Sequence, residues 1–475
     1  MSARIVSFGT YLPAWRLDRG AVAEALGIPP GKGTRAVASY DEDATSMAVE
    51  AGRRALAAAP GDVRPATLAF ATTTPPYADK TNATAVHAAL GLDASASAYD
   101  MVGSVRSAVG ALRAGLDAAA AGRPSLVVAG DVRTGLPGGV DERDGGDGAS
   151  AFLLAAEGPA LAEVLAHASS TAEFLDRWRT PGDVAGRMWE ERFGEHAYVP
   201  LAEAAVQDAC KQAGITTEDI DVLVVSGLHQ RAVRRVAGSV SAGRDIVLGD
   251  LTSTIGNPGA AQPGILLAAA LEKATPGQVI ALVVLADGAD CIVLRAGEGV
   301  AGFRPQRTLE EQEAEARRDL AYATFLTWRG LLRREPPRRP DPERPAAPPS
   351  FRSEDWKFGF TGTRCTACDT RHLPPARVCL QCHAVDRMVP ERLADVPATV
   401  ATYTVDRLTY SLNPPVVIAV IDFDGGGRYQ CELTDVDPEA VRIGDRVAMT
   451  FRRLYTADGV HNYFWKARPL TPQEA

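Results

Sequence analysis

The sequence lacks a concentrated basic surface and any apolar run long enough to cross a bilayer. Its 50 lysines and arginines are outnumbered by 59 aspartates and glutamates, for a net charge of −9. Nucleic-acid binding needs a dense basic patch to neutralise phosphates, so the charge argues against nucleic acid as a partner. The first residues lack the apolar core of a signal peptide, and we expect a cytoplasmic protein without membrane segments.

Cysteine is scarce as well, with seven in 475 residues. Three stand alone in apolar segments, as is typical of reduced core residues rather than of disulfides: Cys210, Cys291 and Cys431. The other four form two CxxC pairs, Cys365 with Cys368 and Cys379 with Cys382. This spacing predicts a structural zinc held by four thiolates, with two disulfides or unliganded loop thiols as alternatives. Because four cysteines close the coordination sphere, we expect catalysis elsewhere.

The length of 475 residues and the 46% hydrophobic content predict several folded domains. Residues 1 to about 300 alternate short apolar runs with alanine-rich helical stretches, which is typical of an α/β layered fold. The pattern occurs twice. Helix 48–56 and strand 67–73 are echoed by 205–213 and 222–227, and segments 125–130 and 146–154 by 279–294. We therefore predict a duplicated half of about 150 residues, with the two halves at 1–165 and 166–303.

Beyond residue 303 the composition changes. Residues 304–350 are predicted to be a helical segment followed by an extended linker, because the many prolines from Pro336 onward cannot hold a helix. Residues 351–388 contain the four paired cysteines and are predicted to form a zinc ribbon. Residues 389–475 carry short alternating strands, which favour an all-β barrel of OB type.

Several motifs carry a family resemblance. They are the opening strand Ile5–Pro13, His229 in a strand-to-loop turn, and Asn257 within Gly-Asn-Pro-Gly-Ala-Ala. Together with the duplicated α/β half they resemble the thiolase superfamily, in particular its hydroxymethylglutaryl-CoA synthase and ketoacyl synthase III branch. Residues 351–470 resemble the zinc-ribbon and OB-fold proteins that accompany thiolase-like enzymes. The resemblance implies a five-layer αβαβα fold, a coenzyme A thioester as substrate and a homodimer.

The resemblance also implies roles for two side chains. His229 and Asn257 would stabilise the negative charge of a thioester enolate or oxyanion. From the residues alone, His229 can equally be a hydrogen-bonded core histidine, and Asn257 can simply shape the turn beside Pro258.

The expected nucleophile is where the chain departs from the family. The segment that carries the family's cysteine falls on 103–115, where Val105 takes the cysteine position and Ser104 precedes it. The acidic residue of the synthases falls on Thr73. Ser104 is either a substitute nucleophile or a helix cap, and Tyr77 and Asp100 are candidate proton carriers.

These observations predict an acyl-CoA-dependent enzyme that makes or breaks a carbon–carbon bond. The first hypothesis is an acyltransferase similar to hydroxymethylglutaryl-CoA synthase but without its cysteine. Two alternatives stay open: a retro-aldol lyase acting on a 3-hydroxyacyl-CoA, and a scaffold that binds acyl-CoA or a partner enzyme without catalysis.

Overall fold

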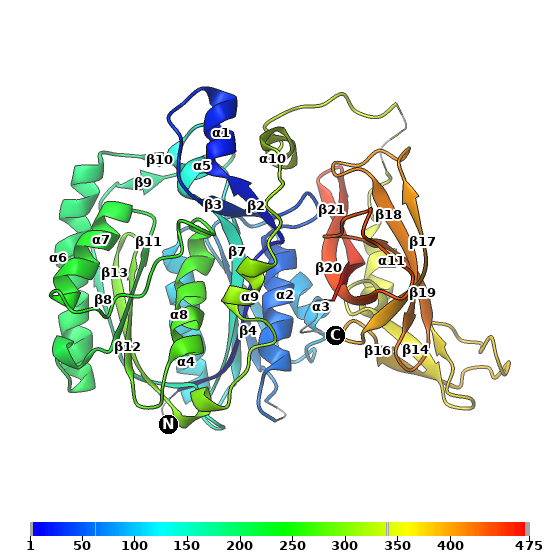
Figure 1. Ribbon diagram of the computed structural model, residues 1–475. Helices are drawn as coiled ribbons and strands as arrows, with labels where there is room; N and C mark the ends of the chain where they lie inside the picture. Colours follow the sequence, from blue (N-terminus) through cyan, green and yellow to red (C-terminus); the bar gives the residue numbers. More distant parts are fainter. Residues whose placement is uncertain (1–2, 62, 339, 341, 471–475) are drawn as a thin grey trace. The chain divides into compact units, whose positions relative to one another are not determined.

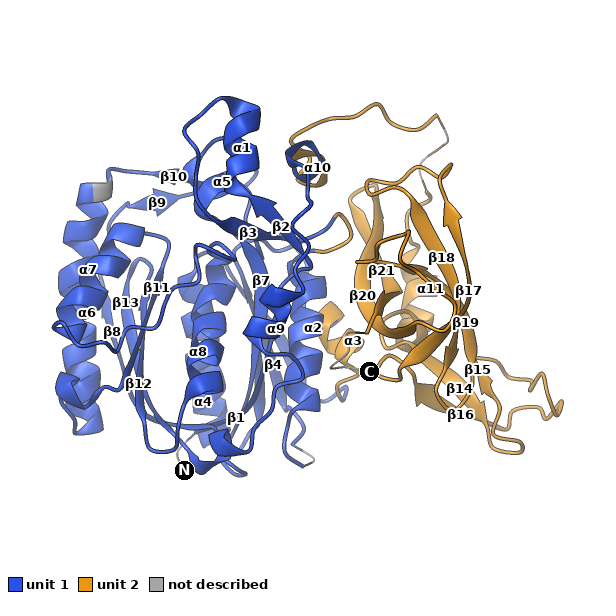
Figure 2. Cartoon of the chain, in the orientation of Figure 1, with its two compact units in different colours: residues 1–39, 43–84, 93–325 blue, residues 40–42, 85–92, 326–475 orange. Residues whose placement is uncertain are grey.

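The structure is a computed structural model that describes residues 3–61, 63–338, 340 and 342–470. It divides into two compact units, shown in different colours in Figure 2. The α/β unit comprises residues 1–39, 43–84 and 93–325, and the barrel unit comprises 40–42, 85–92 and 326–475. Residues 339 and 341 of the expected linker lie outside the described residues. The domain boundaries given above remain predictions.

One nine-stranded mixed sheet runs through the α/β unit. In spatial order its strands are β11 (Val222–Gly227), β12 (Val279–Leu285), β13 (Gly288–Ala296), β8 (Ala162–Thr171), β1 (Arg4–Tyr11), β7 (Asp147–Ala155), β6 (Ser125–Val132), β4 (Thr67–Thr72) and β5 (Ser97–Val102). Strands β1 and β8 join the two halves of this sheet through only two residue pairs, Arg4 with Glu163 and Ile5 with Ala162.

Strand pairing repeats between the halves. In the first half β4 pairs in parallel with β5 and β6, and β6, β7 and β1 follow in antiparallel pairs. In the second half β11 pairs in parallel with β12, and β12, β13 and β8 follow in antiparallel pairs. In the first half, β5 lies beside β4. At the matching place beside β11 in the second half, Leu223 and Val247 form an isolated parallel bridge. The predicted duplication is confirmed.

Helices separate and cover the two halves of the sheet, as Figure 1 shows. Helices α4 (Arg106–Ala120) and α8 (Gln262–Lys273) lie between the halves and contact strands of both. Helix α2 (Ala44–Ala57) packs on β1, β7 and β6, while α6 (Glu191–Ala213) and α7 (Gln230–Ser241) cover the opposite side. The result is the five-layer αβαβα arrangement that the resemblance implied.

Local sequence explains these elements. The strand β12 reads Val-Ile-Ala-Leu-Val-Val-Leu and every residue is buried, as expected for a strand covered by helices on both faces. Helix α2 begins at Asp43, whose carboxylate accepts from the Ser46 amide while the Ser46 hydroxyl accepts from the Asp43 amide. This capping box satisfies donors that the first helical turn leaves unpaired.

Smaller elements complete the α/β unit. They are β2 (Trp15–Asp18), α1 (Arg19–Leu26), β3 (Thr34–Val37), α5 (Val140–Asp144), β9 (Arg177–Trp178), β10 (Arg187–Met188), the 3₁₀ turns η1 (Thr217–Asp219), η2 (Gly259–Ala261) and η3 (Glu298–Ala301), and α9 (Leu309–Ala314). Most of helix α3 (Ala83–Leu90) belongs to the barrel unit. In the predicted helical segment 304–335, helix is confined to α9 and α10 (Tyr322–Trp328). The rest of that segment's described residues form turns or irregular structure.

The barrel unit contains a small sheet and a closed barrel. After α11 (Ala347–Arg352) and α12 (Glu354–Lys357), the small sheet has the order β15 (Arg371–His372), β14 (Thr361–Cys365) and β16 (Met388–Arg392). The barrel runs β17 (Ala398–Asp406), β18 (Val416–Phe423), β19 (Arg428–Leu433), β21 (Val460–Pro469) and β20 (Arg446–Ala457). Burial alternates along β18, as expected for a strand with one face in a barrel core.

A buried ion network lies within the barrel unit, which includes the short segment Tyr40–Glu42. The Arg452 guanidinium contacts Glu42 at 2.7 Å and Asp435 at 2.6 Å. The Lys466 ammonium contacts Asp41 at 3.0 Å and Glu432 at 2.7 Å. Both cations are almost fully buried, so these carboxylates offset a large desolvation cost.

No helix among the described residues is both long enough and apolar enough to cross a membrane.

The carboxyl group of Glu272 on α8 generates a stability prediction. Burial raises its pKa to about 7, although the Leu309 amide donates to it. A group with a raised pKa in the folded state stabilises the fold below its unfolded pKa and loses that contribution as pH rises through the folded pKa. Glu272→Gln should therefore match the wild type near pH 4.5 and unfold at a higher temperature than the wild type at pH 8.

Thermal unfolding across this pH range measures the effect. Glu298→Gln, a change at an exposed glutamate of the same unit, is the control and should follow the wild-type pH profile. A Glu272→Gln difference that does not vary with pH would contradict the assignment.

Candidate functional site

A cavity of about 740 Å³ lies within the α/β unit. This volume falls in the range of about 300–1,000 Å³ that is usual for small-molecule sites. Its wall includes the loop after β4, the start of α4, the turn from β11 to α7, the turn from β12 to β13, and the segment 176–186 around β9 and β10. Both halves of the duplicated fold therefore contribute to one cavity.

Two of the four predicted catalytic residues line this cavity, namely Ser104 and His229. Val105, at the position expected for the family's cysteine, also lines it and is buried. Asn257 and Tyr77 are not among the described residues of its wall. The structure thus brings Ser104, just before α4, and His229 to one cavity. It does not bring Asn257 or Tyr77 to the described wall of that cavity.

His229 is held by the helix that follows it. Its side chain is only 7% exposed and caps α7, where Nδ1 accepts a hydrogen bond from the Ala232 amide at 3.1 Å. The ring of Tyr198 lies 6.0 Å from the imidazole, measured between ring centroids. A buried histidine facing a cavity and fixed by a backbone contact is suited to orient a substrate.

Ser104 precedes α4, and its Oγ accepts from the Arg106 amide at 3.2 Å. This contact satisfies the first N-terminal donor of the helix, whereas the N-cap position itself is Val105, whose side chain makes no capping hydrogen bond. The Arg106 side chain in turn binds the Asp290 carboxylate at 2.9 Å and the Asp287 carbonyl at 2.7 Å. The hydroxyl therefore lines the cavity while it also stabilises the start of the helix.

The remaining candidates have structural contacts. The Asn257 amide donates to the Gly227 carbonyl at 2.9 Å, and its oxygen accepts from the Gly259 amide at 3.0 Å, so it ties two turns together. The Asp100 carboxylate accepts from the amides of Asn82 and Ala83 at 2.7 Å. The Tyr77 amide bonds to Asn82 in the same loop.

Sequence reasoning missed a buried pair on the opposite wall. Asp176 is 5% exposed, Tyr198 is 4% exposed, and both line the cavity. The Tyr198 hydroxyl lies near the Asp176 carboxylate and the Asp287 backbone. Burial raises the pKa of both groups, while His229 and the Tyr198 hydrogen bond act to lower that of Asp176. No motif surrounds these residues, and only the fold brings them beside His229.

Three arginines also line the cavity: Arg133, Arg177 and Arg179. The Arg133 guanidinium donates to the Thr73 hydroxyl at 3.2 Å, and Arg179 donates to the Thr73 carbonyl. Arg177 pairs with Asp141. Burial, together with Arg177 and Arg179, lowers the pKa of Arg133. This wall is positive, as suits thioester or phosphate oxygens.

No cysteine is present among the described residues that line the cavity. Cys210 on α6 and Cys291 on β13 are buried in the core between that helix and the sheet. Burial raises the pKa of both thiols, so they lack the thiolate character of a nucleophile.

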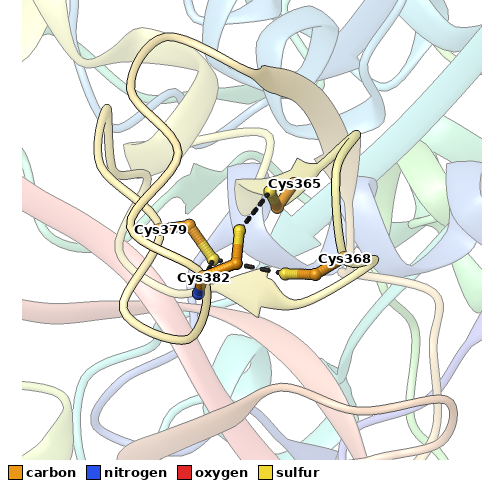
Figure 3. A group of neighbouring side chains, drawn as sticks. All are labelled: Cys365, Cys368, Cys379 and Cys382. Carbon is orange, nitrogen blue, oxygen red and sulfur yellow. Dashed lines mark hydrogen bonds between the residues drawn. The ribbon is translucent and has the colours of Figure 1, made fainter.

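In the barrel unit, the side chains of Cys365, Cys368, Cys379 and Cys382 converge on one point (Figure 3). Their sulfur atoms all lie within 4.8 Å of one another, with 3.7 Å between Cys365 and Cys382 and 3.4 Å between Cys368 and Cys379. Zinc–sulfur bonds of about 2.3 Å in a tetrahedron place sulfurs about 3.8 Å apart, whereas a disulfide needs about 2.05 Å. The cluster is compatible with zinc.

Comparison with known proteins agrees with this description. A family model described as the C-terminal OB-fold domain of ChsH2 matches residues 391–452. A structure titled as MvaS in complex with 3-hydroxy-3-methylglutaryl coenzyme A has a TM-score of 0.60 at 20% identity and covers 72% of this chain and 95% of its own. FabH of Pseudomonas aeruginosa PAO1 has a TM-score of 0.56 at 23% identity, covering 62% and 99%. The fold is that of the thiolase-superfamily condensing enzymes.

Sequence relatives define the family. Hydroxymethylglutaryl-CoA synthase of Pyrobaculum arsenaticum is 30% identical over 302 residues, covering 61% of this chain and 86% of the relative. That of Aeropyrum pernix is 29% identical over 345 residues, covering 70% and 95%. The chain belongs to the hydroxymethylglutaryl-CoA synthase family and carries a C-terminal OB-fold domain.

The four-cysteine cluster generates a metal prediction. Cys365→Ala should remove bound zinc and lower the unfolding temperature of the barrel unit, because a structural zinc contributes directly to folding. Elemental analysis and calorimetry measure the two effects. Cys431→Ala, which truncates a buried thiol of β19 outside the cluster, should keep the zinc.

The α/β unit should unfold as in the wild type in both variants. Unchanged zinc in Cys365→Ala would show that the cluster is not the metal site. Unfolding of both units in a single transition in Cys365→Ala would contradict the prediction that an extended linker separates them.

Proposed function

We propose that this chain makes or breaks a carbon–carbon bond in an acyl-CoA thioester without forming a cysteine-bound acyl-enzyme. The observation that carries the proposal is a cavity of about 740 Å³ that contains His229, an arginine-rich wall and no thiol among its described lining residues. The chemistry is aldol-type. A thioester enolate adds to a carbonyl in one direction, and a 3-hydroxyacyl-CoA is cleaved in the other.

Aldol-type chemistry fits the side chains at hand. In cleavage, a base takes the proton of the 3-hydroxyl and the bond between C2 and C3 breaks. Its electron pair passes to the thioester as an enolate, and protonation at C2 completes the reaction. No acyl group is transferred to the protein, so the valine at position 105 is no obstacle. Hydrogen-bond donors around the enolate oxygen lower the barrier.

Acyl transfer through Ser104 is less well supported. A serine needs an adjacent base to become nucleophilic, and the Oγ of Ser104 already accepts a helix amide. The acyltransferase hypothesis therefore survives as condensation directly between two bound partners. Its bond-forming step, like the reverse of cleavage, is the addition of an enolate to a carbonyl.

Family resemblance supports three further parts of the proposal. A similar structure is titled as a synthase complexed with CoA, which supports coenzyme A as the carrier here. We propose a structural zinc on the four cysteines and a cytoplasmic homodimer. Strand β5 ends the sheet among the described residues, and Tyr99 on it is 59% exposed, which suits an edge that pairs with a second copy.

Incubation with acetyl-CoA and with longer 3-hydroxyacyl-CoA thioesters tests the proposal. We expect products of cleavage or addition, while intact-mass analysis shows no covalent adduct. A stable adduct lost in Ser104→Ala would instead indicate a serine nucleophile. A protein that binds CoA but leaves every thioester intact would be a scaffold.

His229 generates a second test in the same assay. His229→Ala should lower turnover by about 10²–10³-fold, as does removal of one oxyanion donor, and should cost about 1 kcal/mol of stability because the side chain caps α7. His196→Ala, a change at an exposed histidine on α6, is the control and should keep wild-type turnover. Equal rates for His229→Ala and the wild type would remove this histidine from the mechanism.

A further inference from the structure

The hydrogen bond to His229 fixes which of its ring nitrogens carries the proton. Nδ1 accepts from the Ala232 amide, so in the neutral ring Nδ1 carries the lone pair and Nε2 carries the hydrogen. A second proton on Nδ1 would break this helix cap and place positive charge at the N-terminus of α7, where the helix dipole opposes it. His229 is thus suited to donate from Nε2 and poorly suited to accept a proton.

Asp176 lies on the Nε2 side of His229, as the surroundings of Gly194 show. A Cβ atom built at Gly194, in the first turn of α6, would lie 2.6 Å from His229 Nε2 and 2.6 Å from Asp176 Oδ1. The two side chains therefore approach the same point, and only glycine at position 194 leaves room for both. The Tyr198 hydroxyl, one turn further along α6, lies near the same carboxylate.

Other candidates for proton transfer in this cavity are committed elsewhere. Thr73 stands where the family resemblance places an acid, and its hydroxyl donates to Asp131 at 2.8 Å. Of the other aspartates in the wall, Asp183 accepts from Thr180 at 2.5 Å and Asp287 is exposed. Asp176 is the buried aspartate of the wall.

We propose that Asp176 is the catalytic acid and base of this cavity, that His229 is a fixed donor to the thioester oxygen, and that Tyr198 is a positioning residue. This inference rests on the proposed aldol-type function. In cleavage, the Asp176 carboxylate takes the proton of the 3-hydroxyl as the bond between C2 and C3 breaks. The enolate oxygen accepts a hydrogen bond from His229 Nε2, and the Asp176 carboxylic acid returns its proton to C2. Atoms and electrons balance without a further reactant.

The surroundings of Asp176 set the direction of its pH response. Burial raises its pKa above the usual 3.8. His229 from α7, the Tyr198 hydroxyl from α6 and Arg177 from β9 lower it, and Asp287 from the turn after β12 raises it. A base works only when ionised, so the rate should increase with pH through this raised pKa. Because the Tyr198 hydroxyl lowers the pKa of Asp176, removing it should shift the increase in rate to higher pH.

Exchange of the C2 hydrogens of acetyl-CoA and propionyl-CoA in D₂O tests the assignment, with the full-length protein and NMR detection. Asp176→Asn should lower the exchange rate by at least about 10²-fold, as expected for loss of an acid–base group, and should abolish its acid limb. Asp176→Glu should recover part of the rate. Tyr198→Phe should retain exchange with its acid limb shifted to higher pH.

Asp208→Asn, which removes an exposed carboxylate on α6 that is not among the described residues of the cavity wall, is the control and should exchange within about threefold of the wild type. Calorimetric titration with CoA should give the same affinity for all these variants. Wild-type exchange in Asp176→Asn would overturn the inference while leaving the proposed function standing. Loss of CoA affinity in Asp176→Asn would reduce Asp176 to a structural role and also overturn it. A wild-type protein that binds CoA without any exchange would overturn both proposals.

Discussion

The carboxylate of Asp131 organises the floor of the cavity. It is fully buried in β6 and accepts hydrogen bonds from the Thr72 hydroxyl at 2.8 Å, the Thr73 amide at 2.6 Å and the Ala260 amide at 2.7 Å. The hydroxyls of Thr73 and Thr74 add two more. Five donors balance one buried charge, and they come from both halves of the duplicated fold. The loop after β4 is thereby held in one conformation.

This arrangement has a chemical consequence for position 73. A carboxylate there would lie within hydrogen-bonding range of Asp131, and two such charges cannot both be ionised without strong repulsion. With threonine, Asp131 is the one carboxylate among the described residues at this point, and the Thr73 hydroxyl donates to it instead of competing with it. The acid–base chemistry that we propose lies on the opposite wall, where Asp176 enters from the excursion between β8 and α6.

Repetition and spacing made much of the architecture predictable. The echo of helix, turn and strand predicted the duplicated sheet, because buried strands and amphipathic helices have their own periodicities. The two CxxC pairs predicted the cysteine cluster, because ligands to one metal must lie on tight turns. Ser104 and His229 both line the cavity, since each stands just before a helix that begins there, and their catalytic roles stay predictions.

Other site residues left no trace in the sequence. Asp176 and Tyr198 lie 53 and 31 positions before His229 in the chain. They belong to a short hairpin and to a helix, without a recurring pattern. Tertiary packing brings them together, and the missing side chain of Gly194 leaves room for Asp176 beside His229. Asn257 shows the converse. Its motif is conspicuous, yet both ends of its amide are used to join two turns. A motif identifies a constrained position but does not say whether the constraint is chemical or structural.

The membership of Tyr40–Glu42 in the barrel unit limits how this chain can be divided. A fragment cut at the proline-rich segment would retain Arg452 and Lys466 in its interior but leave Asp41 and Glu42 behind. Arg452 would keep Asp435 and Lys466 would keep Glu432, but each buried cation would lose its other carboxylate partner, so the truncated barrel would be less stable. Splitting the gene at that point would therefore cost electrostatic stability. This favours keeping the two units in one polypeptide.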